Sequence, residues 1–319
     1  MKAIRVHAFG GPEVLSLDDV PEPEAGPSEI AIRVCAIGVN PVDTYVRAGI
    51  YGPRTFPFTL GGECAGVVLA LGEGVSGFAV GDRVYAARTV SGAYAERATC
   101  DARMVRKLPD KVSLDKGAAL GTAAATAYMA LFLRGDARPG QTVLIHGASG
   151  GVGIAAVQLA RASGLEVIGT AGSADGAKLV AAEGAHHVLD HSTGDVPERV
   201  ARITHGKGVD LIVEMLANKN LSADLGMLAK RGRVVVVGSR GRVEIDPRDT
   251  MTRQADVRGM SLFNATDEDW QVIHAALAAF LESGALRPIV GKTLPLADAA
   301  TAHREIIEGK AHGKIILVP

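Results

Sequence analysis

Cysteine is scarce in this 319-residue chain, which contains only Cys35, Cys64 and Cys100. Their number is odd and their spacing is wide, whereas a disulfide framework needs pairs and a thiolate metal site needs closely spaced ligands. The sequence therefore argues against both kinds of site. We expect the three thiols to pack as small apolar side chains.

The chain also has no excess of positive or negative charge, because its 34 Lys and Arg residues nearly balance its 35 Asp and Glu residues. A near-neutral chain has no electrostatic footprint for general binding to nucleic acid or to an anionic membrane, so a small-molecule partner is favoured. The longest uncharged run, residues 117–133, is rich in Ala, Gly and Thr, which is typical of a buried helix rather than a bilayer helix. Residues 1–6 lack an apolar signal core. We therefore expect a cytoplasmic protein without membrane contacts.

Glycine, by contrast, is abundant, with 39 residues, while aromatic residues make up only 4% of the chain. This composition suits an α/β protein, whose tight turns and close helix contacts need small side chains. The chain is also longer than one hydrophobic core usually serves, which predicts two domains.

Two patterns follow each other along the chain. Up to about residue 107, short alternating runs separated by Pro and Gly predict a β-rich domain, with strands at 30–37, 65–71, 83–87 and 93–99. Beyond residue 114, apolar strands alternate with helical segments, which predicts five or six parallel strands in one doubly wound sheet. These predicted segments are 142–146, 152–162, 166–170, 177–183, 188–190, 209–214, 221–230 and 234–237.

The last fifty residues lose this rhythm. Trp270, Ile273, Leu277 and Leu281 recur at helical spacing, and a strand at 292–295, a helix at 297–308 and a strand at 314–318 follow. We expect these segments to return to the β-rich domain, which would make that domain discontinuous.

The string His146-Gly-Ala-Ser-Gly-Gly-Val-Gly153 joins a predicted strand to an Ala-rich helix. Glycine at such a turn lets a pyrophosphate approach free N–H groups at the positive end of the helix. The strand before it and the helix after it favour a dinucleotide site over a merely compact turn.

The next predicted strand ends in Gly169-Thr-Ala-Gly-Ser173. It lacks the Asp or Glu that binds the adenine ribose 2′-hydroxyl in NAD-specific folds. A 2′-phosphate would not be repelled there, and Lys178, His191 or Arg240 could approach it. The sequence therefore favours NADPH over NADH. The nearby Asp175 is the one residue that argues for NADH, because its carboxylate would repel a 2′-phosphate.

Several strings in one order resemble the zeta-crystallin-like quinone oxidoreductases, which are zinc-free members of the medium-chain dehydrogenase/reductase superfamily. The resemblance runs from the first strand to the last. It is carried by Gly38-Val-Asn-Pro-Val-Asp-Thr-Tyr45, the turn 146–153, Glu214-Met-Leu-Ala-Asn-Lys-Asn220, Val237-Gly-Ser-Arg240 and Asp246-Pro-Arg-Asp-Thr-Met251.

This resemblance implies an α/β fold with two parts. One is a Rossmann domain with a doubly wound parallel sheet at residues 124–267, and the other is a discontinuous, β-rich, GroES-like catalytic domain at 1–123 and 268–319. It also implies that no zinc is bound. Asn40 and Gly62 stand where zinc-dependent members carry Cys and His, and Glu63 alone cannot make a three-ligand catalytic site.

The resemblance places Asn40 and Tyr45 in the substrate space, and we expect Tyr51 to join them with its phenol donor. Around NADPH we expect the following residues, with Lys178 and Lys314 as cations for its phosphates: Tyr45, Thr126, Ser149, Gly150, Gly151, Val152, Gly172, Lys178, His191, Asn220, Val237, Gly238, Ser239, Arg240, Ser261, Leu262, Phe263 and Lys314.

The expected reaction is reduction of a quinone by NADPH, without a metal, a covalent intermediate or an obligatory protein base. Quinones accept electrons readily, so orientation beside the nicotinamide supplies much of the catalysis. Reduction of an enone or enoyl double bond is an alternative that the sequence leaves open. A non-catalytic role in binding AU-rich RNA or as a crystallin is a second alternative, which the neutral charge disfavours. The family suggests a homodimer or homotetramer.

Overall fold

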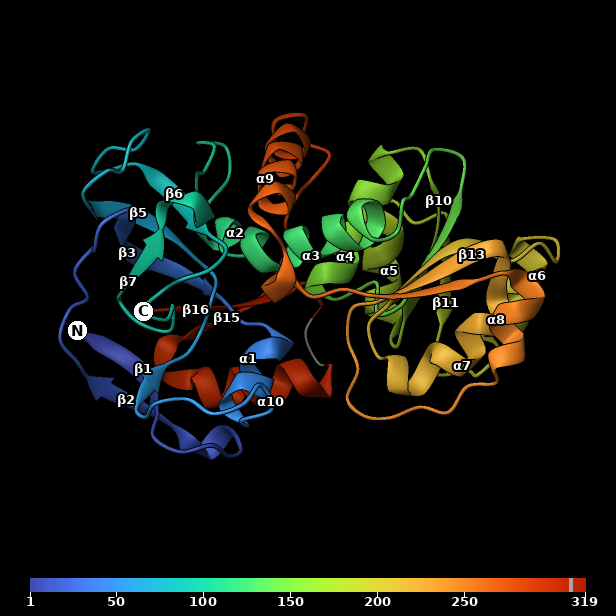
Figure 1. The fold of residues 1–319 in the computed structure, drawn as a ribbon, viewed down its shortest axis with the longest axis horizontal. Coiled ribbons are helices and arrows are strands. Elements are labelled where there is room, and N and C mark those ends of the chain that lie inside the picture. Colours follow the sequence, from blue (N-terminus) through green and yellow to red (C-terminus); the bar gives the residue numbers. More distant parts are fainter. Residues whose placement is uncertain (310–311) are drawn as a thin grey trace. The chain divides into compact units, whose positions relative to one another are not determined.

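The computed structural model describes residues 1–309 and 312–319 and divides the chain into two compact units. The first unit comprises Met1–Ala123 and Pro288–Pro319, and the second comprises Ala124–Arg287 (Figure 1). The C-terminal segment thus returns to the first unit. The prediction that the β-rich domain is discontinuous is confirmed.

The first unit is built on two β-sheets. In the smaller sheet, β1 pairs with β2 and with β4. In the larger sheet the order is β15-β16-β3-β5-β6-β8, and β7 also pairs with β3. The strands are β1 (Lys2–Val6), β2 (Leu15–Asp19), β3 (Glu29–Gly38), β4 (Phe58–Thr59), β5 (Cys64–Leu71), β6 (Arg83–Ala86), β7 (Arg97–Asp101), β8 (Val105–Lys107), β15 (Val290–Pro295) and β16 (Lys314–Val318).

Strand β16 explains why the C-terminal segment belongs here. It lies parallel to β15 and antiparallel to β3, with Leu317 opposite Ile37. Leu317 and Ile37 are both fully buried. The last strand of the chain is therefore inserted beside β3, the longest strand of the first segment, and fills the core there.

Short helices cover the first unit. They are α1 (Pro41–Arg47), α2 (Leu114–Gly117) and α10 (Ala299–Glu308). Helix α1 begins at Pro41, whose fixed φ suits a first helical position, and the Asp43 carboxylate accepts the Asn40 N–H at 2.8 Å. Helix α10 ends at Gly309, which takes the left-handed conformation that favours glycine.

The second unit is a doubly wound sheet. All of its strand pairs are parallel, in the order β11-β10-β9-β12-β13-β14. The strands are β9 (Thr142–Ile145), β10 (Glu166–Ala171), β11 (His187–Asp190), β12 (Val209–Glu214), β13 (Leu228–Val236) and β14 (Asp256–Gly259). The chain winds outward from β9 in both directions, so the predicted Rossmann sheet is confirmed and its switch point lies between β9 and β12.

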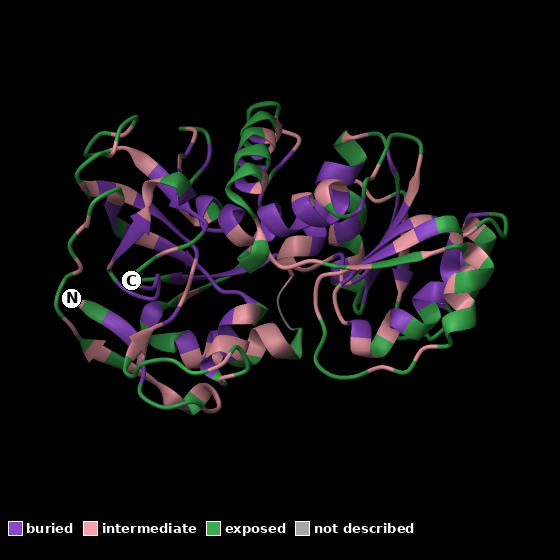
Figure 2. Cartoon of the chain, viewed as in Figure 1, coloured by how far each residue is buried: buried purple, intermediate pink, exposed green. Residues whose placement is uncertain are grey.

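This unit also contains helices, most of which pack directly on the sheet. They are α3 (Ala125–Tyr128), α4 (Gly151–Ala162), α5 (Ala174–Ala182), α6 (Val196–Ile203), α7 (Ala217–Met227), α8 (Pro247–Arg253) and α9 (Asp267–Glu282). Helix α4 is mostly buried, whereas α8 has no buried residue (Figure 2). No helix in the described part of the chain is both long and apolar enough to cross a membrane.

Two details differ from the sequence prediction. Helix α9 lies in the second unit, although we expected residues 268–287 in the first, because α9 packs on α3 and buries Trp270 and Ile273. The strand expected at 93–99 begins only at Arg97, because Ala93–Ala95 make irregular backbone bonds with Gly61, Leu60 and β1.

The insertion of β16 can be tested by truncating its buried face. Leu317→Ala should lower the free energy of unfolding in urea by about 2–5 kcal/mol, because it opens a cavity in a fully buried position. The matched control is Val318→Ala on the same strand, where the side chain is 39% exposed and the expected change is below about 1 kcal/mol. Equal losses for both variants would contradict this account of the core.

Candidate cofactor and substrate sites

The glycine turn follows β9 and leads into α4. Gly147 has a positive φ of 57°, and a Cβ added at Gly153 would lie 2.4 Å from the Gly147 carbonyl oxygen. Larger residues would therefore push the turn away from the helix. The N-cap, Gly150, brings no side-chain acceptor to the first turn of α4. The first N–H groups of this 12-residue helix are left to an external anion, which fits a dinucleotide diphosphate.

The other predicted cofactor residues of the second unit gather at the same edge. Gly172 and His191 follow β10 and β11, and the site of a Gly172 Cβ is only 2.6 Å from the His191 Nε2. The segment Val237–Arg240 follows β13 and binds the start of α7, because the Arg240 N–H donates to the Asn218 Oδ1 at 2.8 Å. Ser261, Leu262 and Phe263 follow β14. Carboxyl ends of parallel strands share one edge, where doubly wound folds bind ligands.

The residues named for the 2′-phosphate lie beyond β10. Ser173 caps α5 by accepting the Gly176 N–H at 3.1 Å. Lys178 lies 3.6 Å from Asp175, and both side chains are about four-fifths exposed. The carboxylate that speaks against NADPH is thus paired with a cation, although such an exposed pair contributes little energy. Thr126 lies buried on α3, while Tyr45 and Lys314 belong to the first unit.

A buried cluster beneath the glycine turn, here named the carboxylate network, comprises His146, Glu214 and Asp224. The His146 Nε2 is 2.8 Å from the Asp224 Oδ1 and 3.5 Å from the Glu214 Oε2. Burial raises the pKa of Glu214 and the pKa of Asp224 to about 7, and it lowers the pKa of His146. We did not predict this cluster from the sequence. A signal was present, because Glu214 ends an apolar strand and Asp224 lies three residues after Leu221, on the same face of the helix.

Ligand atoms of these three residues all lie within 4.8 Å of one another, which raises the question of a metal ion. Two ligands of a tetrahedral zinc ion are separated by about 3.3 Å, given Zn–N and Zn–O distances of about 2 Å. The 2.8 Å contact between His146 and Asp224 is shorter and is a hydrogen bond. The carboxylate network therefore has the geometry of a hydrogen-bonded cluster.

In the first unit, Asn40, Glu63 and Lys314 form what we call the ammonium site. The Lys314 Nζ donates to the Asn40 Oδ1 at 2.5 Å and to the Glu63 Oε2 at 2.7 Å. The Asn40 Nδ2 donates its two hydrogens to the Glu63 Oε2 and the Gly38 carbonyl. Each side chain is at least 95% buried. We expected Lys314 to contact a phosphate and did not predict this pairing. Lys314 is separated from Glu63 by 251 positions in the sequence and from Asn40 by 274.

Zinc does not fit these residues. The place of one metal ligand holds an amide whose hydrogens and oxygen are bonded, and Gly62 offers no side chain. The Glu63 carboxylate is already neutralised by the Lys314 ammonium. A divalent ion bound to the Asn40 and Glu63 oxygens would be repelled by the Lys314 ammonium, which already lies within hydrogen-bond distance of both oxygens.

A second buried chain, the tyrosine chain, runs through Asp43, Tyr94, His303 and Arg47. Arg47 can only donate, so the His303 Nδ1 at 2.8 Å is an acceptor. The neutral ring then donates from Nε2 to the Tyr94 oxygen, and the Tyr94 hydroxyl donates to Asp43, each at 3.1 Å. Burial raises the pKa of Asp43 to about 7, and burial beside Arg47 lowers the pKa of His303 to about 3.

The tyrosine chain holds helix α1, and the three predicted substrate residues lie on this helix or next to it in the sequence. Asn40 precedes the helix and Tyr45 lies on it, whereas Tyr51 follows it and is 55% exposed. The structure thus brings Asn40 into the ammonium site and leaves Tyr51 at the surface of the first unit.

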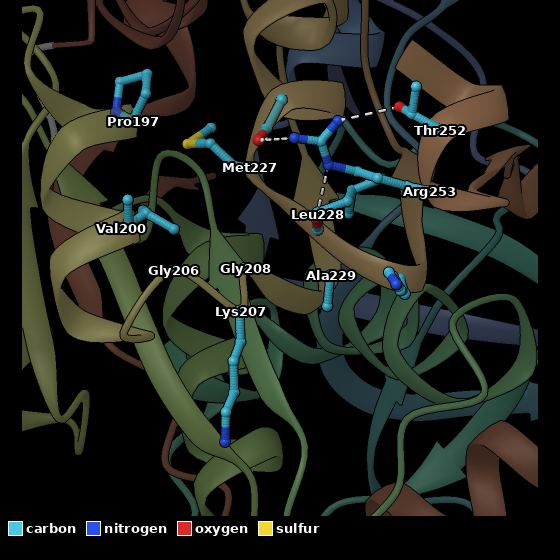
Figure 3. Close-up of a pocket in the computed structure, with 13 residues that line it drawn as sticks. Pro197, Val200, Gly206, Lys207, Gly208, Met227, Leu228, Ala229, Thr252 and Arg253 are labelled. Atoms are coloured by element: carbon cyan, nitrogen blue, oxygen red, sulfur yellow. Dashed lines mark hydrogen bonds between the residues drawn. The ribbon is translucent and has the colours of Figure 1, made fainter. Parts of the chain in front are cut away.

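A separate hollow of about 710 Å³ lies at the other edge of the second sheet, next to the amino ends of β12 and β13. Arg253 closes part of it by donating to the Leu228 and Gly226 carbonyls (Figure 3). Its lining includes none of the predicted cofactor residues, so the hollow is distinct from the glycine-turn edge.

A glycine turn at the switch point of a doubly wound sheet, joined to a β-rich unit, defines a dinucleotide-binding oxidoreductase of the medium-chain dehydrogenase/reductase type. Two family models match: an alcohol dehydrogenase GroES-like domain at residues 26–110 and a zinc-binding dehydrogenase domain at 151–279. The human quinone oxidoreductase is 47% identical over all of this chain and 98% of its own length. The chain belongs to the quinone oxidoreductase family.

Solved structures agree with this assignment. The Escherichia coli quinone oxidoreductase in complex with NADPH has a TM-score of 0.92 and 32% identity, covering all of both chains. A mycobacterial protein in complex with NADPH has a TM-score of 0.93 and 37% identity, again over both full chains. The predicted family and fold class are confirmed.

The raised pKa of Asp43 predicts a pH dependence of stability. The native carboxyl keeps its proton up to about pH 7, whereas the unfolded one loses it near pH 4, so this stability is present at low pH and is lost as the pH rises through 7. Asp43→Asn should therefore lose less free energy of unfolding than wild type between pH 5 and pH 8. Urea unfolding at both values measures the difference.

The other buried groups are common to both proteins in this comparison. His303 acts with the opposite sign, because its lowered pKa adds stability as the pH rises from 3 to about 6.5. Its effect, like that of Glu214 and Asp224, cancels between wild type and variant. An identical pH dependence in the two proteins would show that Asp43 titrates in the folded state as it does in the unfolded state.

Proposed function

We propose that this protein reduces quinones with NADPH and without a catalytic metal. The observation that carries the metal-free reaction is the Lys314 ammonium held between Asn40 and Glu63 in the first unit. The observation that supports the nucleotide is the open N-terminus of α4 over the glycine turn. The overall change is NADPH + H⁺ + quinone to NADP⁺ + hydroquinone, in which NADPH supplies the two electrons.

For the nucleotide, we propose the predicted residues of the second unit as its contacts. The N–H groups of Gly151 and Val152 would bind the diphosphate, and Gly172 and His191 would border the adenine ribose. The preference for NADPH rests on the end of β10, where Ala171, Gly172 and Ser173 follow one another without a carboxylate. Lys178 and Arg240 remain the proposed cations for the 2′-phosphate, and Lys314 would contact a phosphate only through its remaining hydrogen.

For the quinone, we propose that Asn40, Tyr45 and Tyr51 shape the substrate space. Both amide hydrogens of Asn40 are already donated, so its role is to hold Lys314 rather than to polarise a quinone oxygen. The phenols of Tyr45 and Tyr51 supply hydrogen-bond donors. Partial burial raises the pKa of Tyr51 further above its ordinary value, which already keeps the phenol protonated at neutral pH. A homodimer or homotetramer in the cytoplasm remains our proposal from the family resemblance.

The proposed activity is tested by following NADPH oxidation with ortho-quinones, para-quinones and enones as acceptors. We expect turnover with quinones, lower turnover with enones, weaker binding of NADH than of NADPH, and no loss of rate when a zinc chelator is present. The Tyr45→Phe variant should turn over more slowly, because it lacks the phenol donor. Turnover with enones alone would replace quinone reduction by double-bond reduction.

The nucleotide site is tested at Gly153. In Gly153→Ala the new methyl would meet the backbone of Gly147 and Ala148 at 2.4 and 2.6 Å, which displaces the turn. We expect the Kd for NADPH, measured by its fluorescence, to rise at least tenfold. The control is Gly226→Ala on α7, where nothing lies within 4 Å of the added Cβ and the Kd should not change. An unchanged Kd in Gly153→Ala would remove the diphosphate from this turn.

A further inference from the structure

The carboxylate network does not end at its three residues but reaches the glycine turn. His146 follows β9 directly and its side chain is 8% exposed, whereas the side chains of Glu214 and Asp224 are fully buried. Asp224 accepts the His146 Nε2–H, which leaves Nδ1 as an acceptor, 3.5 Å from the Thr170 hydroxyl. The same hydroxyl oxygen accepts the Gly147 N–H at 3.1 Å. Asp224 on α7 is thereby connected to the first glycine of the turn.

On its other side, the carboxylate network holds the start of α7. Glu214 accepts the Leu216 N–H in a short hydrogen bond. Its two oxygens also accept from the Asn220 Nδ2, at 3.1 and 3.2 Å. A carboxylate is an acceptor only, so it determines which way the Asn220 amide faces. The Nδ2 is committed to Glu214, and the Oδ1 is the atom that Asn220 can offer to a ligand.

We propose that Glu214, held by His146 and Asp224, is a positioning residue for the nucleotide: it orients Asn220 so that the amide oxygen accepts a hydrogen bond from a hydroxyl or carboxamide group of NADPH. This inference rests on the proposed function, because it takes NADPH as the ligand of this edge. The charged or titratable groups that act on Glu214 are His146 and Asp224. The network therefore links two cofactor-binding segments, the glycine turn and the start of α7, through one buried set of bonds.

The Glu214 carboxyl group contributes mainly through the hydrogen bonds that its oxygens accept, and less through its negative charge. Its burial disfavours the ionised form and raises its pKa, whereas the N–H groups of Leu216 and Asn220 need its oxygens. A glutamine at position 214 keeps one such oxygen, but an alanine keeps none. If Glu214 positions Asn220 through its oxygens, the glutamine and alanine variants should therefore differ in their affinity for NADPH.

The test compares NADPH binding and turnover in Glu214→Ala, Glu214→Gln and wild type. We expect the Kd and the KM for NADPH to rise about tenfold in Glu214→Ala, with kcat at saturating NADPH within about twofold of wild type. Glu214→Gln should recover most of the affinity. If the alanine variant fails to fold, Glu214→Gln is the test by itself: its Kd should rise by clearly less than tenfold, because one of the two acceptor oxygens is lost and one is kept.

A double-mutant cycle with Asn220→Ala shows whether Glu214 acts through Asn220. If it does, Glu214→Ala, which raises the Kd about tenfold in the wild-type background, leaves the Kd unchanged in the Asn220→Ala background, because the oriented amide is already gone. Equal factors in both backgrounds would overturn the proposal. So would a fall in melting temperature without any change in Kd, because that is the result of a purely structural role.

Asp210→Asn is the matched control. Asp210 lies on the same strand, β12, but it accepts the Thr142 N–H at 2.8 Å near the amino ends of the strands. Its loss should lower stability and leave the Kd for NADPH unchanged. If wild-type protein itself does not bind NADPH, the proposed function fails. If wild type binds and the Glu214 variants bind equally well, only the present inference fails.

Discussion

The ion pair between Lys314 and Glu63 is the contact on which the first unit depends most. Both side chains are almost fully removed from water, so each charge is stable only in the presence of the other. Breaking such a pair typically costs about 3–5 kcal/mol, because the remaining charge is left buried and unpaired. The pair also joins the start of β16 to the start of β5. The same bond thus keeps the C-terminal segment in its sheet and fixes a positive charge beside Asn40.

Buried polar groups organise the second unit in the same way. Strand ends at the glycine-turn edge are held by His146, Glu214 and Asp224, while the strands themselves are apolar. Such networks cost desolvation energy, and they persist when nearly every donor and acceptor has a partner. One exception is the Asp224 Oδ2, which is buried without a hydrogen-bond partner. The raised pKa values of Glu214 and Asp224 express this cost, because a shared proton relieves it.

The features that could be predicted from the sequence are those determined by residues close together in the chain. The glycine turn, five of the six parallel strands and the return of the C-terminal segment have local signals, namely glycine spacing, apolar runs and a change of rhythm, whereas β14 was not located. The pairings within the buried networks have no local signal, because the partners are far apart in the sequence: His146 and Asp224 are separated by 78 positions and Arg47 and His303 by 256. Helix α9 was assigned to the wrong side of the boundary for a related reason. Its spacing reveals an apolar face but not the core that the face packs against.

The same bonds limit the chemistry that the first unit offers. Asn40 has no amide hydrogen left, Glu63 accepts from Lys314, Asn40 and the Thr122 N–H, and Lys314 has donated two of its three hydrogens. What the ammonium site can present is one further N–H of a cation, and the phenols of Tyr45 and Tyr51 would be added to it in the proposed substrate space. These groups donate hydrogen bonds to oxygen, which suits an acceptor that gains electrons and becomes more negative. Oxidation of an alcohol needs the reverse, a base or metal that takes the hydroxyl proton. In this site the carboxylate that would act as that base is held by an ammonium, an amide and a backbone N–H.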